Sequence, residues 1–199
     1  MGEKLFNNLD LLQPEIMLAL YGRGAFPMAD EFGEINWYMP QTRAIIPLDD
    51  YNVPRSLRKF MERSDFEYAF SKRRLDVIYG CASREETWIS KELIEAYERL
   101  IELEHLHSVE VYKDGRLVGG LYGITIGGAF FGESMFSSVE QASKAALVKL
   151  IERLNERGFV LLDVQYLTEH LKMFGAREID FDEFSRLLAE SYKRDVFFV

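Results

Sequence analysis

The residue that is best suited to take part in a reaction lies in an apolar segment. Residues 130–136 read FFGESMF, which places Glu133 among large apolar side chains in a segment typical of a buried strand. A carboxylate in such a strand must be paired with a cation, be hydrated in a cleft or take part in chemistry. Two interpretations of Glu133 therefore stay open here, a structural ion pair and a site residue.

A second segment repeats this pattern. Residues 161–165 read LLDVQ, an apolar run that contains an acid and ends in an amide. Asp163 and Gln165 are two residues apart, so on a strand their side chains share one face. The C-terminal end of an apolar strand is a frequent place for the site of an α/β protein. The alternative interpretation is that Asp163 caps the following turn.

Metal and nucleotide motifs have no support in the sequence. The histidines His105, His107 and His170 lack the HExxH or Cys/His spacing of a metal site, and Cys81 is the single cysteine. Neither GxGxxG nor GxxxxGK[ST] occurs, so a dinucleotide site or a P-loop is not predicted. We therefore expect no metal, and a lone thiol favours a reducing compartment.

The elements that must position these residues alternate in type. Asp114-Gly115 is a hairpin turn signal, Ser138 with Gln141 predicts a capping box, and Gly158 predicts a helix end. Apolar spacing predicts helices over 54–63, 73–81, 91–104, 139–157, 168–174 and 180–192, and strands over 66–70, 108–112, 117–125, 129–135 and 159–165. This order predicts an α/β (α+β) fold, with a mixed sheet flanked by helices as in acetyltransferases.

The first fifty residues differ in composition from the rest. They contain four of the five prolines, which are Pro14, Pro27, Pro40 and Pro47. Because proline removes a backbone donor and fixes φ, we expect a helix over 14–23 and loops with short extended pieces over 25–47, rather than a central sheet. We place a boundary near residue 50, which gives a small N-terminal domain of residues 1–50 and an α/β domain of residues 51–199.

Charge limits the partners of the chain. The 199 residues carry a formal net charge of −9, which argues against broad binding along a nucleic-acid duplex. Residues 55–74 are locally basic, with seven bases against three acids. This window is either a solvated helix surface or a phosphate-contacting patch. Since the chain has neither an apolar stretch of about 20 residues nor a secretory signal, we expect a cytoplasmic protein.

Several strings resemble those of the leucyl/phenylalanyl-tRNA–protein transferase family, and they occur in the same order from about residue 20 to residue 184. They are YGRGAFPM (21–28), GCASREETWIS (80–90), EAYERL (95–100), HSVEVY (107–112), LVGGLYG (117–123), FFGESMFS (130–137), ASKAAL (142–147), LLDVQ (161–165) and HLKMFGA (170–176). Each string alone is modest, but their common order argues against coincidence. GESMFS and GG-x-YG are the most specific of them.

The resemblance implies an activity and partners. The family transfers Leu or Phe, and sometimes Met, from aminoacyl-tRNA to proteins that begin with Arg or Lys, which marks them for degradation. Its fold is a small N-terminal domain followed by an acetyltransferase-like domain. An aminoacyl ester is already activated, so we expect no cofactor. The expected partners are aminoacyl-tRNA and a protein or peptide N-terminus, and we expect a monomer without membrane association.

The resemblance also assigns roles to residues. Gln165 matches the catalytic glutamine, Asp163 the acid that polarises it, and Glu133 the acid that helps place the acceptor. Gln165 Oε1 can accept a hydrogen bond from the attacking amine, while Asp163 orients the carboxamide. The expected substrate-binding set is Phe130, Leu121, Trp88, Leu150, Tyr21, Tyr97, Ser137 and Met28, and the expected tRNA-binding set from the basic window is Arg55, Lys59, Arg73 and Arg74.

The chain departs from the family at one of these positions. The family usually reads Phe-Pro-Trp where this chain has Phe26-Pro27-Met28, and the smaller, flexible methionine leaves the preference among Leu, Phe and Met open. Two other functions are open at this point, a CoA-dependent N-acetyltransferase on the same fold and an inert tRNA- or peptide-binding module. The acetyltransferase would need a glycine-spaced pyrophosphate loop after the hairpin, where the chain instead reads GESMFSSVEQ.

Overall fold

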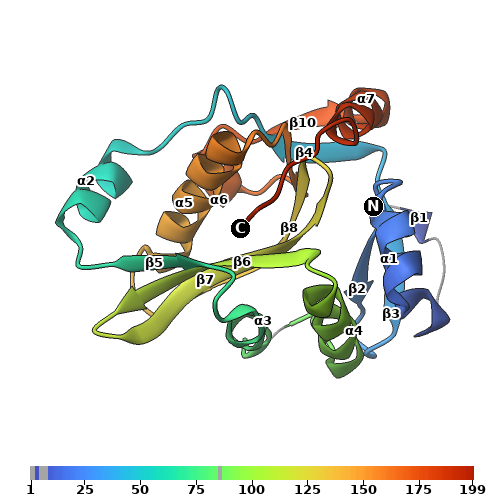
Figure 1. Ribbon diagram of the computed structural model, residues 1–199, viewed down its shortest axis with the longest axis horizontal. Coiled ribbons are helices and arrows are strands. Elements are labelled where there is room, and N and C mark those ends of the chain that lie inside the picture. The colour runs from blue at the N-terminus through green and yellow to red at the C-terminus, as the bar shows by residue number, and fades with distance from the viewer. Residues whose placement is uncertain (1–2, 5–8, 85–86) are drawn as a thin grey trace.

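Two sheets organise the chain (Figure 1). The structure is a computed structural model, which describes residues 3–4, 9–84 and 87–199. The large sheet has seven strands in the order β10-β4-β9-β8-β7-β6-β5, and the small sheet has three in the order β1-β3-β2. In the large sheet β8 and β9 run parallel, and the other neighbouring strands are antiparallel. The expected mixed α/β sheet is confirmed.

The strands have the following bounds. The small sheet consists of β1 (Glu3–Lys4), β2 (Phe26–Ala29) and β3 (Ile35–Met39). The large sheet consists of β4 (Thr42–Ile46), β5 (Glu67–Phe70), β6 (Leu106–Lys113), β7 (Arg116–Ile126), β8 (Ala129–Ser137), β9 (Leu161–Gln165) and β10 (Arg177–Asp180).

Helices cover both faces of the large sheet (Figure 1). On one face, here called the α5 face, lie α2 (Arg55–Arg63), α5 (Ala142–Arg157) and α6 (Glu169–Lys172). On the other, the α4 face, lie the small sheet with η1 (Leu9–Leu12) and α1 (Pro14–Tyr21), α3 (Arg74–Ala82), α4 (Lys91–Glu102) and α7 (Phe181–Ser191). Within the described part of the chain, no helix has the length and apolarity to cross a bilayer.

The hairpin of β6 and β7 forms where the turn signal predicts it. Asp114 and Gly115 both have positive φ, 51° and 69°, as a two-residue turn between twisted strands requires. Three helices begin at a side-chain cap, because Ser90, Thr168 and Asp180 each accept a hydrogen bond from a backbone N–H in the first turn. The turn signal at Asp114-Gly115 is therefore confirmed.

The start of α5 differs from the prediction. Ser138 does not cap this helix, because both its backbone N–H and its Oγ donate to the carbonyl of Val118, at 2.8 and 2.9 Å, which ties Ser138 to β7. The helix begins at Ala142, after Gln141 with a φ of 66°. Ser137 supplies a side-chain acceptor instead, since its Oγ accepts from the N–H of Ser143 at 3.0 Å.

Residues 25–47 contain the short extended pieces that were expected, but the expectation that they lie outside a central sheet is wrong. This segment contains three strands, and β4 lies inside the large sheet between β10 and β9. The prolines Pro40 and Pro47 flank β4 and leave its donors free to pair, while Ala44, Ile45 and Ile46 are buried. Although it precedes the expected boundary near residue 50, β4 belongs to the large sheet.

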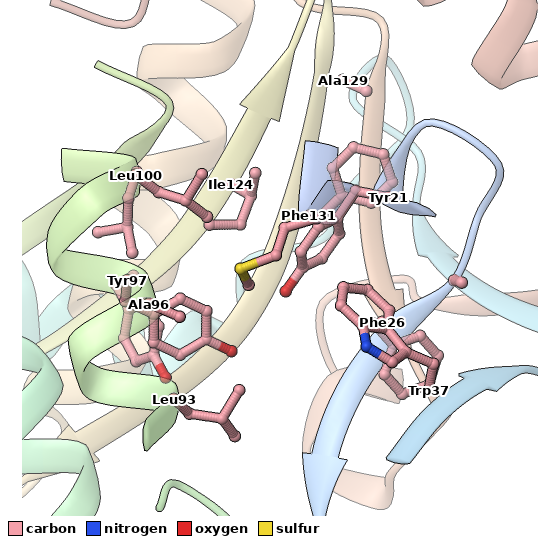
Figure 2. Close-up of a cluster of buried hydrophobic side chains, with 14 of the residues drawn as sticks. Tyr21, Phe26, Trp37, Leu93, Ala96, Tyr97, Leu100, Ile124, Ala129 and Phe131 are labelled. Carbon is pink, nitrogen blue, oxygen red and sulfur yellow. The ribbon is translucent and has the colours of Figure 1, made fainter. Parts of the chain in front are cut away.

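A buried aromatic cluster joins the N-terminal elements to the sheet (Figure 2). Tyr21 of α1 lies edge-on to Trp37 of β3, with ring centroids 5.8 Å apart, and 5.5 Å from Phe131 of β8. Tyr97 of α4 approaches the sheet from the opposite side of the cluster. Two hydroxyl-bearing rings from separate helices are thereby brought to the middle of the large sheet.

Candidate active site

The two strands that carry the predicted acids separate near the middle of the sheet. The parallel pairing of β8 with β9 ends at Phe131 opposite Asp163. Just beyond this point, consecutive residues of β7 pair with Gly132 and Ser134, so Glu133 is the extra residue of a bulge. The bulge reverses the alternation of side chains along β8, because Phe131 before it and Phe136 after it both pack on the α4 face.

A second bulge lies opposite the first, in β9. Consecutive residues of β4 pair with Asp163 and Gln165, so Val164 is the extra residue there. Bulges bend a strand and redirect its side chains. Two bulges on facing strands therefore open a gap in the sheet beyond the last β8–β9 pair.

A cavity of about 110 Å³ occupies this gap. Most of its wall is apolar, and its polar groups include Glu133 and Gln165 at the α4 face. The lining residues are Leu121, Tyr122, Gly132, Glu133, Ser134, Met135, Leu147, Leu150, Leu162, Val164, Gln165 and Leu171. An apolar space of this size suits one medium-sized apolar side chain of a ligand whose polar groups meet Glu133 and Gln165.

Glu133 is held by neutral hydrogen-bond donors. Its Oε1 accepts from the Tyr21 hydroxyl at 2.9 Å and from Gln165 Nε2 at 3.1 Å, and its Oε2 accepts from the Tyr97 hydroxyl at 3.1 Å. Burial raises the pKa of Glu133 from 4.5 to about 7, although the two tyrosine hydrogen bonds lower it. The same burial, with the nearby Glu133 charge, raises the pKa of both tyrosines, so they remain protonated donors.

Gln165 stands in a strained turn. Its φ is +64°, a value that non-glycine residues adopt infrequently. The N–H of Tyr166 donates to the carbonyl of Val164 at 2.8 Å, which closes a three-residue γ-turn around Gln165. Such conformations cost about 1–3 kcal/mol and are concentrated at functional sites. The turn directs the Gln165 carboxamide toward Glu133.

The Asp163 side chain lies outside the cavity wall, in the packed interior. It is fully buried and forms a two-pronged ion pair with Arg43 of β4, at 2.9 Å from Nε and 2.6 Å from Nη2. Its Oδ1 also accepts from the backbone N–H of Gln165 at 2.9 Å. This contact reaches Gln165 through its main chain, while the carboxamide donates to Glu133. The hydrogen bond from the Gln165 N–H is the one expected if Asp163 caps the following turn, which was the alternative interpretation of this residue.

Comparison with known proteins identifies the family. Residues 45–189 match the family "Leucyl/phenylalanyl-tRNA protein transferase", and residues 10–41 match the N-terminal domain of the same family. The chain belongs to the leucyl/phenylalanyl-tRNA–protein transferase family. The predicted resemblance and the prediction of an aminoacyltransferase are therefore confirmed.

Curated relatives agree over nearly the whole chain. A leucyl/phenylalanyl-tRNA–protein transferase of Herpetosiphon aurantiacus is 48% identical over 181 residues, covering 90% of this chain and 94% of the relative. That of Rubrobacter xylanophilus is 48% identical over 185 residues, covering 92% and 97%. That of Ruegeria sp. is 44% identical over 182 residues, covering 90% and 87%.

Solved structures match more distantly. A ribosomal-protein-alanine N-acetyltransferase from Brucella melitensis shares 13% identity with a TM-score of 0.38, covering 54% of this chain and 84% of that one. The structure of L-PGS from Bacillus licheniformis shares 15% identity with a TM-score of 0.44, covering 80% and 55%. Because both TM-scores are below 0.5, the fold follows from the sheet and helices of this chain.

Several residues expected from the family converge at the site. Leu121 and Leu150 line the cavity, and Tyr21 and Tyr97 hold Glu133. Four of the eight expected substrate-binding residues thus lie either in the cavity wall or against Glu133, which is part of that wall. Their positions in the chain are far apart, so strand β7 and the three helices α1, α4 and α5 bring them together.

The other four expected residues lie elsewhere. Phe130 is fully buried at the paired end of β8, where its ring is 5.6 Å from that of Phe198. Trp88 and Met28 pack on the N-terminal aromatic cluster, and the carbonyl of Trp88 accepts from the N–H of the residue after Met28 at 3.2 Å. Ser137 serves the first turn of α5.

The expected tRNA-binding residues divide into two groups. Arg55 and Lys59 are exposed on α2. Arg73 pairs with Asp76, and Arg74 is held by Glu104 at 3.0 Å and by backbone carbonyls, with a side chain only 17% exposed. A phosphate contact through Arg74 would require these bonds to break. Among the residues described, no group of three His, Cys, Asp or Glu side chains is arranged as metal ligands.

Sequence reasoning missed Arg43, the partner of Asp163. The signal was present, because an arginine stands beside the apolar run of residues 44–46 between two prolines. A prediction of a buried strand there would have required a partner for the guanidinium. Tyr122, Ser134 and Leu171 also line the cavity; they lie within three of the strings that resemble the family, but no role was assigned to them individually.

Proposed function

We propose that this chain transfers Leu or Phe, and sometimes Met, from aminoacyl-tRNA to the N-terminal α-amine of proteins that begin with Arg or Lys. One observation carries the proposal: an apolar cavity opens between β8 and β9, with Glu133 and Gln165 at its polar end. The cavity takes the donor side chain, and the two polar residues meet the reacting groups. Family membership supplies the reaction class, and the cavity supplies the place for it.

The cavity selects the donor by its apolar lining. Leu121, Leu150 and Leu171 offer no polar partner to a side chain, so a polar amino acid would leave its groups without hydrogen bonds. Discrimination among apolar side chains is coarse, since one methylene changes binding by about 1–3 kcal/mol. Acceptance of more than one apolar amino acid therefore follows from the chemistry of the wall.

The amine acceptor meets Glu133 and Gln165. Glu133 has two oxygens with about four acceptor positions, of which three are used, so an incoming ammonium or amine has a place on Oε2. Gln165 Nε2 donates to Glu133, which leaves Oε1 free of that bond and able to accept from the attacking amine. Most of the rate enhancement then comes from holding two reactants in one geometry.

The reaction balances without a cofactor. The acceptor nitrogen forms a bond to the aminoacyl carbonyl carbon, the ester bond to the terminal ribose breaks, and the amine proton replaces the acyl group on the ribose oxygen. The ester supplies the driving force, so this chain's residues need to bind, orient and accept hydrogen bonds. Because the donor is charged tRNA, we place the reaction in the cytoplasm. From the family we further propose that the product is marked for degradation and that the chain acts as a monomer.

A transfer assay tests the proposal. Wild-type protein, Leu-tRNA or Phe-tRNA and a peptide beginning with Lys or Arg should give a product heavier by one Leu or Phe residue in mass spectrometry. Acetyl-CoA in place of charged tRNA should give no acetylated product. Gln165→Ala should lower kcat strongly while tRNA binding stays near that of the wild type. Acetylation without aminoacyl transfer, or unchanged turnover in Gln165→Ala, would contradict the proposal.

The exposed part of the basic window is the proposed tRNA contact. Arg55→Glu with Lys59→Glu should raise the KM for aminoacyl-tRNA and flatten its dependence on salt, because each neutralised phosphate releases counterions. Arg73→Glu, on the more exposed of the two arginines at α3, should act in the same direction. Arg186→Glu on α7 is a control that matches the charge change of Arg73→Glu and has half the charge change of the double variant. Equal effects of all these variants would remove α2 from the contact surface.

A further inference from the structure

Arg43 is an unusual residue for a protein core. Its side chain is fully buried, and each of its three guanidinium nitrogens has an acceptor: Asp163 for Nε and Nη2, and the Gly24 carbonyl for Nη1 at 2.6 Å. The guanidinium carbon lies 4.6 Å from the ring centre of Phe26 and 4.8 Å from that of Phe184. Apolar residues of similar volume often stabilise a core equally well, so stability alone does not explain this pair.

The contacts of Arg43 lead to the turn at Gln165. One oxygen, Asp163 Oδ1, accepts both from Arg43 Nε and from the backbone N–H of Gln165, each at 2.9 Å. That N–H belongs to the residue whose φ is +64°. A hydrogen bond from an immobile carboxylate can offset the strain of such a turn. Asp163 is immobile because Arg43 grips both of its oxygens.

Arg43 also connects this turn to segments distant in the chain. Gly24 has a φ of +89°, and a Cβ there would lie 2.8 Å from the Phe184 ring, so glycine allows its carbonyl to approach the guanidinium. The residue after Arg43, Ala44, pairs with Gln165 itself. The N-terminal elements, α7 and β9 therefore meet at one buried cation.

We propose that Arg43 is a positioning residue for Gln165, which acts by fixing Asp163 so that its carboxylate holds the main-chain turn. This inference rests on the proposed function. In it Asp163 works as an acceptor for the Gln165 N–H, and its negative charge takes no part in proton transfer. The geometry favours this role, because Asp163 lies outside the cavity wall and both of its oxygens are already occupied.

Two double variants separate the acceptor from the charge. Arg43→Met with Asp163→Asn removes both buried charges but keeps a side-chain oxygen at position 163. Arg43→Met with Asp163→Leu removes the charges and the oxygen. If Asp163 acts through the turn, the Asn variant should retain a kcat at least ten times that of the Leu variant. Both should keep a near-normal KM for aminoacyl-tRNA, because the cavity and Glu133 are intact. Equal loss of kcat in both would overturn the proposal.

A single variant tests the case in which the doubles do not fold. Arg43→Lys keeps the charge but cannot bind both oxygens of Asp163 and the Gly24 carbonyl in the same fork. We expect kcat to fall by about 100-fold, the loss typical of a catalytic group displaced by about 1 Å, with little change in KM. Unchanged kcat in a folded Arg43→Lys protein would equally overturn the proposal.

Arg153 provides a matched control. It lies over the Phe70 ring at 5.0 Å, donates to the Phe198 carbonyl at 2.8 Å and pairs with Glu156 at 3.0 Å, all on the α5 face. Arg153→Lys should lower stability slightly without lowering kcat. If the wild-type protein transfers no amino acid, the proposed function fails. If it does, and the Arg43 variants match Arg153→Lys, only the positioning role fails.

Discussion

Two buried carboxylates on neighbouring strands have contrasting surroundings. Asp163 is bound by a cation through both oxygens, beneath the cavity wall. Glu133 lies at the cavity and is bound by two phenol hydroxyls and a carboxamide, all neutral. The charge of Asp163 is balanced where it stands, whereas Glu133 is buried with neutral partners and has its pKa raised to about 7.

This difference separates an acid with a fixed cation partner from the acid that we propose meets the acceptor amine. A carboxylate gripped by arginine contributes a fixed acceptor, and here it holds the backbone of Gln165. A carboxylate with neutral donors and a pKa near neutrality can change its hydrogen bonding when a charged amine arrives. Sequence alone presented both as acids in apolar strands, so the surroundings decide the roles.

The largest expected difference is in the loss of stability when each carboxylate is removed. Asp163→Ala leaves Arg43 as a buried, unpaired cation, which should cost about 3–5 kcal/mol of unfolding free energy. Glu133→Ala leaves neutral donors without an acceptor, which should cost about 1–3 kcal/mol. Urea unfolding at pH 5, where the folded Glu133 is neutral, measures both values. Equal losses would break the distinction between the two regions.

The next effect is the dependence of stability on pH. An unfolded Glu133 releases its proton near pH 4.5, but the folded one keeps it until about pH 7. Because the folded state binds more protons in this interval, the Glu133 contribution to stability falls as pH rises from 4.5 to 7 and is constant above. The total fall should be about 3 kcal/mol.

Glu133→Gln isolates this contribution, because glutamine does not titrate. The charged and titratable groups that interact with Glu133 include Tyr21, Tyr97, Tyr122, Asp163 and Arg43, and they are unchanged in the variant. The unfolding free energy of the wild type minus that of the variant should decrease between pH 4.5 and 7. Parallel curves for the two proteins would show that Glu133 titrates alike in both states.

A smaller effect concerns Tyr97. Its hydrogen bond lowers the pKa of Glu133, so Tyr97→Phe should raise that pKa further. The acidic limb of kcat/KM, measured with one peptide so that the acceptor amine contributes equally, should move upward by about half a unit to one unit. Tyr68→Phe on β5, at the far edge of the sheet, should leave the limb in place. A shift in both variants would deny the specific link to Glu133.

The smallest effect belongs to the apolar part of the cavity wall. Leu150→Met nearly conserves volume and should cost less than about 1.5 kcal/mol of stability. Because Leu150 lines the cavity, the ratio of Leu to Phe transfer should change by a few fold in a competition assay with both charged tRNAs. The pH limb assigned to Glu133 should not move. A moved limb with an unchanged ratio would reverse the assigned roles of wall and acid.

Much of the fold could be predicted because its signals are local. Asp114-Gly115 set the hairpin, and Gly158 ended α5 with a φ of 80°. The start of α5 was mispredicted because Ser138 is held by the carbonyl of Val118, a partner 20 residues earlier. Strand β4 was not predicted because the prolines that flank it indicated a loop, although the residues between them are largely apolar.

By itself, the sequence determined the family, the α/β order of elements and the presence of acids in two apolar strands. The family follows from the strings that resemble it in the same order, and the elements and their acids follow from short-range patterns of turns, caps and alternation. Only the tertiary structure decided which partners surround each acid. The partner of Asp163 lies 120 residues away, and Tyr21 lies 112 residues from Glu133. Hydrogen-bond partners at such separations depend on strand order and bulges, which no local pattern encodes.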